Sequence, residues 1–224
     1  MTIQSEALRQ IPMFAALNQQ ELAHVARMAI VRHYERGDII LLEGDKGGAL
    51  CYVHQGLVKV FKTSPEGREQ VLRLIAAGHT FNDVPALDGG PNPASAAAME
   101  PSTIYMIRRA ELQQLIMSEP AVAVGAIQML SQALRHLVEL VEDLSLRHVT
   151  ARVAKLLLAQ CTSPTEASRG HRLTQQEMAA IVGTAREVVG RALKELEVAG
   201  AIEVHQGHVT VVNQEYLRLI SGLN

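Results

Sequence analysis

The sequence predicts an α+β fold with an N-terminal antiparallel β-roll, a long helix and a C-terminal winged helix-turn-helix. Three observations predict it. Short runs of strand-forming residues alternate with glycine-containing turns between Val31 and Arg108. Apolar residues then repeat at heptad spacing from Ile127 to Leu144. Two helix-start signals, separated by a glycine turn, follow between Thr174 and Glu187.

The roll is expected to contain strands at residues 38–42, 50–53, 57–61 and 70–75. The segment Ser64-Pro65-Glu66-Gly67 predicts a turn, because proline has the fixed φ that its second position needs and glycine suits the last. With only two cysteines the chain has no disulfide framework and no Cys-x-x-Cys metal site. Cys51 lies in a strand-like run, so we expect it to be a small core residue. No metal site is predicted.

The long helix is expected to begin near Pro120, since proline is tolerated in a first helical turn. Its heptad repeat predicts a parallel dimer seam, although packing on the chain's own roll would explain part of the apolar surface. The predicted seam comprises Ile127, Leu130, Leu134, Leu137, Val141 and Leu144. The expected domains are residues 1–117 (the roll), 118–146 (the helix with the predicted dimer seam) and 147–224 (the C-terminal module).

The C-terminal third contains the most specific pattern in the sequence. Thr174-Gln175-Gln176-Glu177 is a capping box, and Gly183 ends the short helix that follows it. Thr184-Ala185-Arg186-Glu187 has the form of a second box, which would start a helix that ends near Gly200. Residues 202–205 and 208–212, separated by Gln206-Gly207, read as a hairpin. Together these signals predict a winged helix-turn-helix that binds double-stranded DNA.

The second helix has two faces. The apolar residues Val189, Ala192, Leu193 and Leu196 recur at three- and four-residue spacing and should pack on the first helix. The opposite side carries Arg186, Glu187, Gly190, Arg191 and Lys194. Arginine binds guanine bidentately and glutamate accepts from cytosine, which favours base contacts by Arg186 and Glu187. The expected contacts to the DNA backbone are Thr174, Gln176, Thr184, Lys194 and His205.

The charge distribution and the missing catalytic motifs limit the other classes of function that the sequence allows. Residues 1–146 have 12 Lys/Arg against 16 Asp/Glu, a net charge of −4, whereas residues 147–224 have 9 against 7, a net charge of +2. A glycine-rich phosphate loop, a His-Glu-x-x-His motif and a serine elbow are all missing, so we do not expect an enzyme. A ligand-binding regulatory subunit is the other alternative, which the C-terminal module disfavours. The chain shows no signal peptide or membrane span, so the cytoplasm is the expected location.

The sequence resembles the Crp/Fnr family of transcription regulators (catabolite activator and fumarate–nitrate regulator) over nearly its whole length. The resemblance is carried by Glu43-Gly44-Asp45, by Gly56-Leu57-Val58-Lys59-Val60 and, most specifically, by the segment 181–191. It implies a cyclic-nucleotide-binding-like jelly roll and a homodimer with one recognition helix per subunit in successive major grooves. It further implies a near-palindromic operator, RNA polymerase as a partner, and base reading by Arg186, Glu187 and Arg191.

At the position of the family's effector site, this chain lacks the residues that bind cyclic AMP in other members. The resemblance places an effector pocket at Phe81, Asn82, Asp83, Ala94, Ser95, Leu134, Leu137 and Val138. Pro93-Ala94 replaces the arginine pair that neutralises the phosphate of cyclic AMP. Leu137-Val138 replaces the family's adenine-contacting Thr-Ser pair. Cyclic AMP is therefore disfavoured. The N-terminal cysteines of the family's iron–sulfur sensors are missing too, so no iron–sulfur cluster is expected.

The identity of the effector stays open. Haem is an alternative, as in the family's carbon monoxide and nitric oxide sensors, with His33, His54, His79 and His136 as candidate ligands. Control without a ligand, through expression level or oxidation of Cys51, is a second alternative. Whichever applies, a hinge between Leu144 and Thr150 is expected to transmit the signal. Activator and repressor roles are equally compatible with the sequence.

Overall fold

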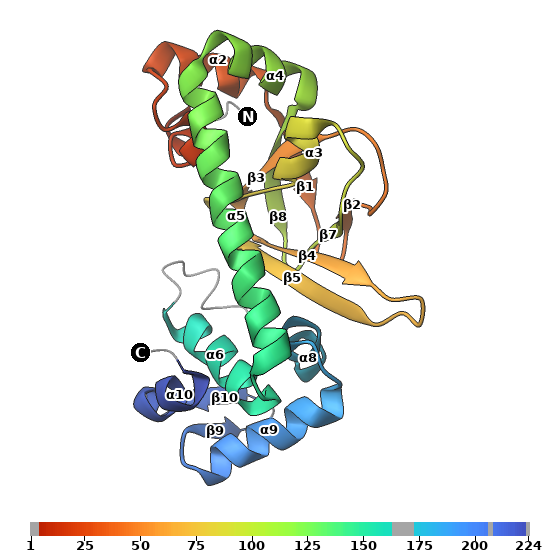
Figure 1. Ribbon diagram of the computed structural model, residues 1–224, viewed down its shortest axis with the longest axis vertical. Coiled ribbons are helices and arrows are strands. Elements are labelled where there is room, and N and C mark those ends of the chain that lie inside the picture. The colour runs from red at the N-terminus through yellow and green to blue at the C-terminus, as the bar shows by residue number, and fades with distance from the viewer. Residues whose placement is uncertain (1–4, 163–172, 206–207, 223–224) are drawn as a thin grey trace. The chain divides into compact units, whose positions relative to one another are not determined.

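Two four-stranded antiparallel sheets form the N-terminal roll (Figure 1). The computed structural model of the chain describes residues 5–162, 173–205 and 208–222. One sheet has the strand order β1-β8-β3-β6 and the other β2-β7-β4-β5. The strands are β1 (Ile30–Tyr34), β2 (Ile39–Leu41), β3 (Ala49–Gln55), β4 (Leu57–Thr63), β5 (Glu69–Ala76), β6 (Thr80–Phe81), β7 (Ser95–Ala98) and β8 (Ser102–Arg108).

The four strands predicted from the sequence are all present, as β2, β3, β4 and β5. The predicted turn between the last two is also confirmed: the Gly67 amide donates to the Ser64 carbonyl over 2.9 Å, and Gly67 has a φ of +79°. The central strand β8 pairs with β1 on one side and β3 on the other, with Tyr105 opposite Val31 and Tyr52. This pairing of distant segments closes the roll.

Helices pack around the roll and were mostly not predicted individually. The N-terminal segment forms α1 (Ser5–Leu8), the 3₁₀ turn η1 (Pro12–Phe14) and α2 (Gln19–Met28). The helix α3 (Asp83–Asp88) follows β6, and α4 (Arg109–Ser118) precedes the long helix α5 (Pro120–Leu146). Asn18 begins α2 with a full capping box, its side chain accepting from the Glu21 amide over 3.0 Å. The predicted start of the long helix at Pro120 is confirmed.

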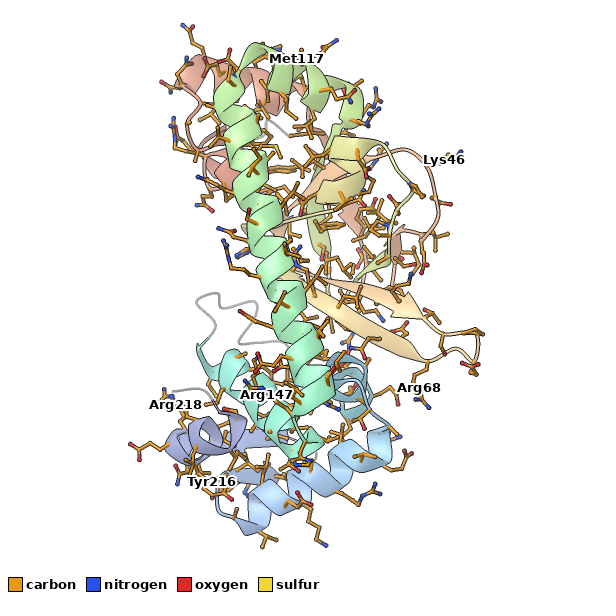
Figure 2. All side chains as sticks on the ribbon, viewed as in Figure 1. Lys46, Arg68, Met117, Arg147, Tyr216 and Arg218 are labelled. Carbon is orange, nitrogen blue, oxygen red and sulfur yellow. The ribbon has the colours of Figure 1, made fainter. Side chains whose placement is uncertain are left out.

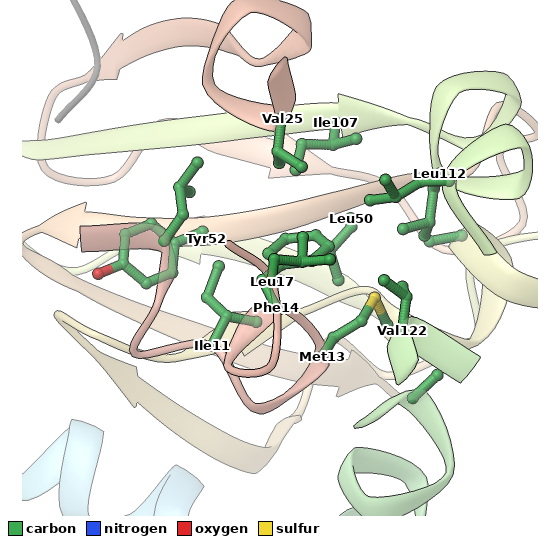
Figure 3. Packing of buried hydrophobic residues seen from close by; sticks show 14 of the residues in the cluster. Ile11, Met13, Phe14, Leu17, Val25, Leu50, Tyr52, Ile107, Leu112 and Val122 are labelled. Atoms are coloured by element: carbon green, nitrogen blue, oxygen red, sulfur yellow. The ribbon is translucent and has the colours of Figure 1, made fainter. Parts of the chain in front are cut away.

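Two apolar clusters form the core of this unit. One lies between the sheets and includes the fully buried Cys51, which confirms its predicted core position. The other joins the N-terminal segment to the outer face of β3 and β8 and to the first turns of α5 (Figure 3). Phe14 is at its centre, surrounded by Met13, Leu17 and Leu50. Complete burial of each of these side chains contributes about 1.5–3 kcal/mol to the stability of the fold. The N-terminal segment is therefore an integral part of the roll.

Gly125 lets the N-terminal segment approach α5 at the backbone. A Cβ at this position would lie 2.5 Å from Met13 Cα and 2.6 Å from the Pro12 carbonyl oxygen. No side chain fits in that space, so only glycine permits the contact. The first half of α5 therefore has a fixed position on the N-terminal segment.

The second unit contains the C-terminal helices and a two-stranded hairpin. Its elements after α5 are α6 (Val149–Thr162), α8 (Gln175–Val182), α9 (Arg186–Val198), β9 (Ile202–His205), β10 (His208–Val211) and α10 (Gln214–Ser221). Helix α6 packs against both α9 and α10, and Val153, Ala154 and Leu157 on it are buried. The predicted helix pair and hairpin are thus confirmed, with β9 and β10 pairing antiparallel. The expected Gln206-Gly207 turn lies outside the described residues.

Contacts divide the chain into units that differ from the predicted domains. The first comprises Met1–Lys62 and Arg73–Leu137, and the second comprises Thr63–Leu72 and Val138–Asn224. The boundary thus falls inside α5, between Leu137 and Val138, and the tip of the β4–β5 hairpin belongs to the second unit. The expected separate dimerisation segment 118–146 is shared between both units.

The joint between α5 and α6 is densely hydrogen-bonded. Arg152 Nη1 donates to the carbonyl oxygens of Asp143 and Arg147, over 3.2 and 3.0 Å. Asp143 pairs with Arg147 at 2.9 Å and with Lys155 at 2.6 Å. Arg147, labelled at the end of α5 in Figure 2, also donates to the Ser221 carbonyl of α10. The helix break is where the hinge was predicted, and these hydrogen bonds and ion pairs brace the corner between the two helices.

Among the described residues, α5 is the one helix whose length and composition would allow it to cross a membrane, with a mean hydropathy of 1.2 over its best 18-residue window. Only 22% of that window is buried. Its exposed apolar side chains include Ile127 and Leu134, which repeat at heptad spacing. This pattern is typical of a helix that pairs with another helix.

Candidate nucleic-acid interface and effector cavity

Helix α9 presents a charged face to solvent. Arg186, Glu187, Arg191 and Lys194 are all exposed. The opposite face is buried, with Val189 at 0% and Leu196 at 1% exposure. This division matches the sequence prediction and arises because the apolar residues recur every three or four positions. The first turn of α9, which holds Arg186 and Glu187, is accessible to a partner.

The preceding helix begins and ends as predicted. The Thr174 hydroxyl accepts from the Glu177 amide over 3.2 Å, and the Glu177 carboxylate accepts from the Thr174 amide over 2.7 Å. Gly183 ends α8 with a left-handed φ of +71°. A Cβ there would lie 2.6 Å from Leu144 Cδ2 and 2.7 Å from Gln70 Oε1. Glycine is favoured here by the left-handed backbone conformation, whereas both close atoms are the ends of side chains that could shift.

The second capping box was predicted wrongly. Ala185 is the N-cap of α9, and no side chain caps that helix. The Thr184 amide instead donates to the Ala179 carbonyl over 3.0 Å, which closes the end of α8. Thr184 thereby belongs to the turn, one residue too early to cap the next helix. The predicted helix itself is present.

Apart from Lys194 on α9, the residues predicted to contact the DNA backbone lie at the start of α8, in the turn before α9 and on β9. Thr174 and Gln176 are exposed at the start of α8, and Thr184 is half-buried in the turn. His205 is exposed at the end of β9, with its Nε2 3.4 Å from Glu203 Oε2. All of these residues lie in the second unit.

A cavity of about 410 Å³ lies in the first unit. Its volume is within the range of small-molecule sites. Helix α5 contributes one face, with Met129, Gln132, Ala133 and His136 at helical spacing. The other lining residues are Gln10, Ile11, Pro12, Arg73, Leu74, Gly78, His79, Thr80 and Asp83.

Asp83 is the electrostatically unusual group of this cavity. It is 8% exposed, and its Oδ1 has no hydrogen-bond partner within the described part of the chain. Burial raises the pKa of the Asp83 carboxyl above its ordinary value, against the opposing effects of the Thr80 hydroxyl and Arg73. Arg73 Nη1 lies 3.8 Å from Asp83 Oδ2. An acceptor and a cation thus face the same space, which suits a ligand with hydrogen-bonding groups.

Only Asp83 of the eight residues predicted for the effector pocket lines this cavity. Phe81 and Ala94 are buried in the core, and the Asn82 side chain donates to the Ala49 carbonyl over 3.0 Å. The Ser95 hydroxyl accepts from the Glu43 amide over 3.0 Å. The other three, Leu134, Leu137 and Val138, are exposed on α5. The cavity is lined instead by Met129, Gln132, Ala133 and His136 of α5, so this cavity and the predicted pocket use different sides of the helix.

Two of the four candidate haem ligands line the cavity, namely His79 and His136. His79 Nδ1 lies 3.3 Å from the Ala77 carbonyl oxygen. His33 is elsewhere, 3.1 Å from the Thr103 hydroxyl, and His54 stacks on the Tyr105 ring. Sequence reasoning missed Arg73 and Gln132, because an isolated polar residue in a strand or helix gives no signal of the cavity it lines.

Cys51 does not suit the predicted oxidative control. Its side chain is fully buried. Burial raises the pKa of the Cys51 thiol far above its ordinary value, and Asp83 raises it further. Oxidation proceeds through the thiolate, which is scarce in such a site. The structure therefore argues against regulation through this residue.

All six residues of the predicted dimer seam are exposed on α5, at 37–64% of their surface. Ile127, Leu134 and Val141 are exposed most, each above 60%. Apolar side chains rarely line up on one solvent-facing helix stripe without a partner. By contrast, Val122 and Met129 are buried against the roll, so α5 has one occupied and one unoccupied apolar face.

Comparison with known proteins defines the class. Residues 31–119 match the model of the cyclic nucleotide-binding domain, and residues 151–220 match the Crp-like helix-turn-helix domain. A roll of this kind followed by a winged helix-turn-helix defines a DNA-binding transcription regulator. The chain belongs to the Crp/Fnr family of such regulators, which are not enzymes.

Relatives match over nearly the full length. The cyclic AMP receptor protein of Thermus thermophilus is 33% identical over 203 residues, covering 89% of this chain and 92% of the relative. The CRP-like cAMP-activated global transcriptional regulator of Mycobacterium tuberculosis is 28% identical over 217 residues, covering 95% and 97%. The structure of FixK2 from Bradyrhizobium japonicum has a TM-score of 0.74 at 23% identity, covering 86% of this chain and 96% of that one, which supports the fold.

Proposed function

We propose that the protein is a homodimeric regulator that binds a near-palindromic operator by placing α9 of each subunit in the major groove. The observation that carries this proposal is the exposed charged face of α9, opposite a fully buried apolar face. Helices of this motif read base edges with their N-terminal residues. Membership of the Crp/Fnr family supports the same placement.

Arg186, Glu187 and Arg191 are the proposed base-contacting residues. Arginine donates two parallel hydrogen bonds to guanine O6 and N7, and glutamate accepts from cytosine N4. The half-sites should therefore contain a G·C-rich core. The proposed contacts to phosphates fix the register of the helix without reading sequence. These are Thr174, Gln176, Thr184, Lys194 and His205.

The dimer is proposed to form through the seam on α5. The six exposed apolar residues repeat at intervals of three and four, which is the spacing that two supercoiled helices need. Pairing would remove this stripe from water, and the two-fold symmetry would match a palindromic operator. RNA polymerase is a further proposed partner, as expected for a regulator of transcription that acts in the cytoplasm.

The cavity on the roll is the proposed effector site. Asp83 supplies an acceptor, Arg73 a cation, and Ile11, Leu74 and Met129 apolar walls. Relatives of this chain are described as cAMP-activated. The segment Pro91–Ser95 nevertheless has no arginine for a phosphate, and Ala94 is packed into the core at 7% exposure. Of the described residues that line the cavity, Arg73 is the one arginine or lysine, and it already faces Asp83. We therefore expect cyclic AMP to bind weakly.

Haem is the second candidate, because His79 and His136 line the same cavity. The contact of His79 Nδ1 with the Ala77 carbonyl leaves Nε2 as the nitrogen that could bind iron, an arrangement typical of ligating histidines. Gln10, Ile11 and Pro12 would cover one side of the group. A bound haem would supply an iron centre whose ligation changes with diatomic gases.

Control by an effector is proposed to act as a population shift between two arrangements of the dimer. The cavity face of α5 carries Met129, Gln132 and His136, so an effector would contact the helix that forms the seam. The braced corner at Arg152 would pass movement of α5 to α6 as a rigid piece. An effector can shift this equilibrium only by its difference in affinity for the two arrangements.

Selection of operators from a random pool of duplexes tests the DNA proposal. We expect an inverted repeat with a G·C-rich half-site, and recovery of unrelated sequences would overturn the proposal.

The absorption spectrum of the purified protein, before and after addition of hemin, tests haem as the effector. A Soret band that is lost in a His79→Ala variant would support haem, and an unchanged hemin spectrum would exclude it. Calorimetric titration with cyclic AMP tests the other effector candidate, for which we expect weak binding.

A further inference from the structure

Gly190 lies within the charged face of α9, where its neighbours all carry long side chains. Arg186 and Lys194 lie one turn before and after it, and Glu187 and Arg191 flank it. The missing side chain leaves a notch in this face. We propose that Gly190 is a clearance position, at which the sugar–phosphate backbone of one DNA strand approaches α9 beside the start of α8. This inference rests on the proposed DNA binding and adds a residue that sets how deeply the helix docks.

The fold itself does not require glycine at position 190. Gly190 is not among the residues with positive φ. Among the described residues, a Cβ built on it would meet nothing closer than Gln175 Oε1 at 3.7 Å, which is an ordinary van der Waals contact with a flexible side chain. Gly125 in α5 is different, because a Cβ there would lie 2.5 Å from Met13 Cα. Glycine in a helix interior is destabilising relative to alanine, so its presence at 190 needs a reason outside the subunit.

The surroundings of the notch suit a phosphate strand. Lys194, a proposed backbone contact, is an exposed cation one turn after it, and Gln175 adds an amide from the first turn of α8. Cations and amides are the groups that contact DNA phosphates. In this motif the first helix crosses the DNA backbone while the second enters the groove. The nearest group to the notch is Gln175 Oε1 of α8, 3.7 Å from the position of a Cβ at Gly190, so the strand that α8 crosses, and not a base edge, is the group expected to fill it.

The substitution Gly190→Ala tests the inference in the full-length protein. We expect the melting temperature to rise, because alanine favours the helix and has room in the subunit. We expect the affinity for the selected operator to fall by about tenfold or more, because an added methyl in a tight contact forces displacement. Since phosphates carry no sequence information, the affinity for random duplex should fall in parallel. Stability and affinity would then change in opposite directions.

Two controls make the outcomes decisive. Val198→Ala changes an exposed residue at the far end of α9 and should leave operator affinity within about twofold. Gly125→Ala should lower the melting temperature, because its Cβ would lie 2.5 Å from Met13 Cα. This variant shows the effect of a methyl group that has no room within the subunit. Operator affinity of Gly190→Ala equal to wild type would overturn the inference, as would a lower melting temperature. A loss confined to particular base pairs would also overturn it, since the contact would then be to bases. Failure of the wild-type protein to select any operator would instead refute the proposed function.

Discussion

Gln70 Nε2 donates to the carbonyl oxygen of Ile181 over 3.4 Å, joining two residues that are 111 positions apart. Ile181 lies in the last turn of α8, where backbone carbonyls have no partner within the helix. The same Gln70 amide also donates to the Val71 carbonyl over 2.9 Å. The tip of the β4–β5 hairpin thus closes the end of the helix that precedes the recognition helix, beside Gly183.

Replacement of Gln70 should weaken the second unit. Gln70→Ala removes the donor and should lower the free energy of unfolding by about 0.5–1.5 kcal/mol, the net value of one hydrogen bond. Gln70→Glu should cost more, because a carboxylate cannot donate and would face the Ile181 carbonyl. Urea denaturation followed by circular dichroism measures both. Equal stability of all three proteins would show that the contact contributes nothing.

Base-contacting and backbone-contacting residues should differ in their effect on specificity. Arg186→Ala and Glu187→Ala should each cost about 1–3 kcal/mol of discrimination against the wrong base pair. Lys194→Ala should weaken binding to all sequences alike. It should also reduce the slope of log affinity against log salt concentration by about one. Competition binding at several salt concentrations measures these quantities. A uniform loss with Arg186→Ala would mean that this residue contacts only phosphate.

A charge placed in the seam should separate the dimer. Leu134→Glu would bury two uncompensated carboxylates between paired helices, so we expect the dimer dissociation constant to rise about a hundredfold or more. Gln128→Glu is the matched control, because it makes the same charge change on α5 away from the seam stripe. Sedimentation equilibrium gives the association state of each. A Leu134→Glu variant as dimeric as its control would refute pairing through this face.

The two threonines of the helix pair should respond differently to alanine. Thr174 caps α8 and its loss should cost about 1 kcal/mol of stability. Thr184 does not cap α9, so Thr184→Ala should leave the unfolding free energy nearly unchanged. Thermal unfolding in the absence of DNA is the appropriate measurement, since both residues are proposed to contact phosphates. Comparable losses in both variants would contradict the assignment of Ala185 as the N-cap.

Asp83 should make stability depend on pH in an identifiable direction. Because burial raises the pKa of its carboxyl in the folded state, this group favours folding at low pH. That stability is fully present below the ordinary pKa and is lost as pH rises through the raised value. As pH rises from about 3.5 to neutrality, the free energy of unfolding of Asp83→Asn should therefore increase relative to that of the wild type. Urea titrations at several pH values give this difference, and a constant or decreasing difference would be inconsistent with the raised pKa.

Local signals in the sequence predicted much of the fold because they act over few residues. The box at Thr174 and the turn at Gly183 depend on neighbours within one helical turn, and both are present. Strand β7 was missed because it contains three consecutive alanines, which favour helix in isolation. Their burial at 1–2% exposure between neighbouring strands overrides that preference.

The candidate sites were predictable to different extents. The face of α9 follows from helical periodicity alone, so Arg186 and Val189 could be assigned to opposite sides. The cavity depends on which side of α5 meets the roll, and the sequence analysis selected Leu134 and missed Gln132. That rotation is fixed by tertiary packing, namely the close contact of the N-terminal segment with Gly125 and the burial of Val122 and Met129. The role of Thr184 likewise depended on a backbone hydrogen bond that its side chain does not reveal.

The contrast between the two cysteines makes the natural chain suitable for spectroscopic labelling. Cys51 is enclosed between the sheets, whereas Cys161 is exposed near the end of α6. A maleimide dye should therefore attach at one position per subunit without any engineered substitution. Two dyes in a homodimer would report the distance between the DNA-binding units by energy transfer, with and without candidate effectors.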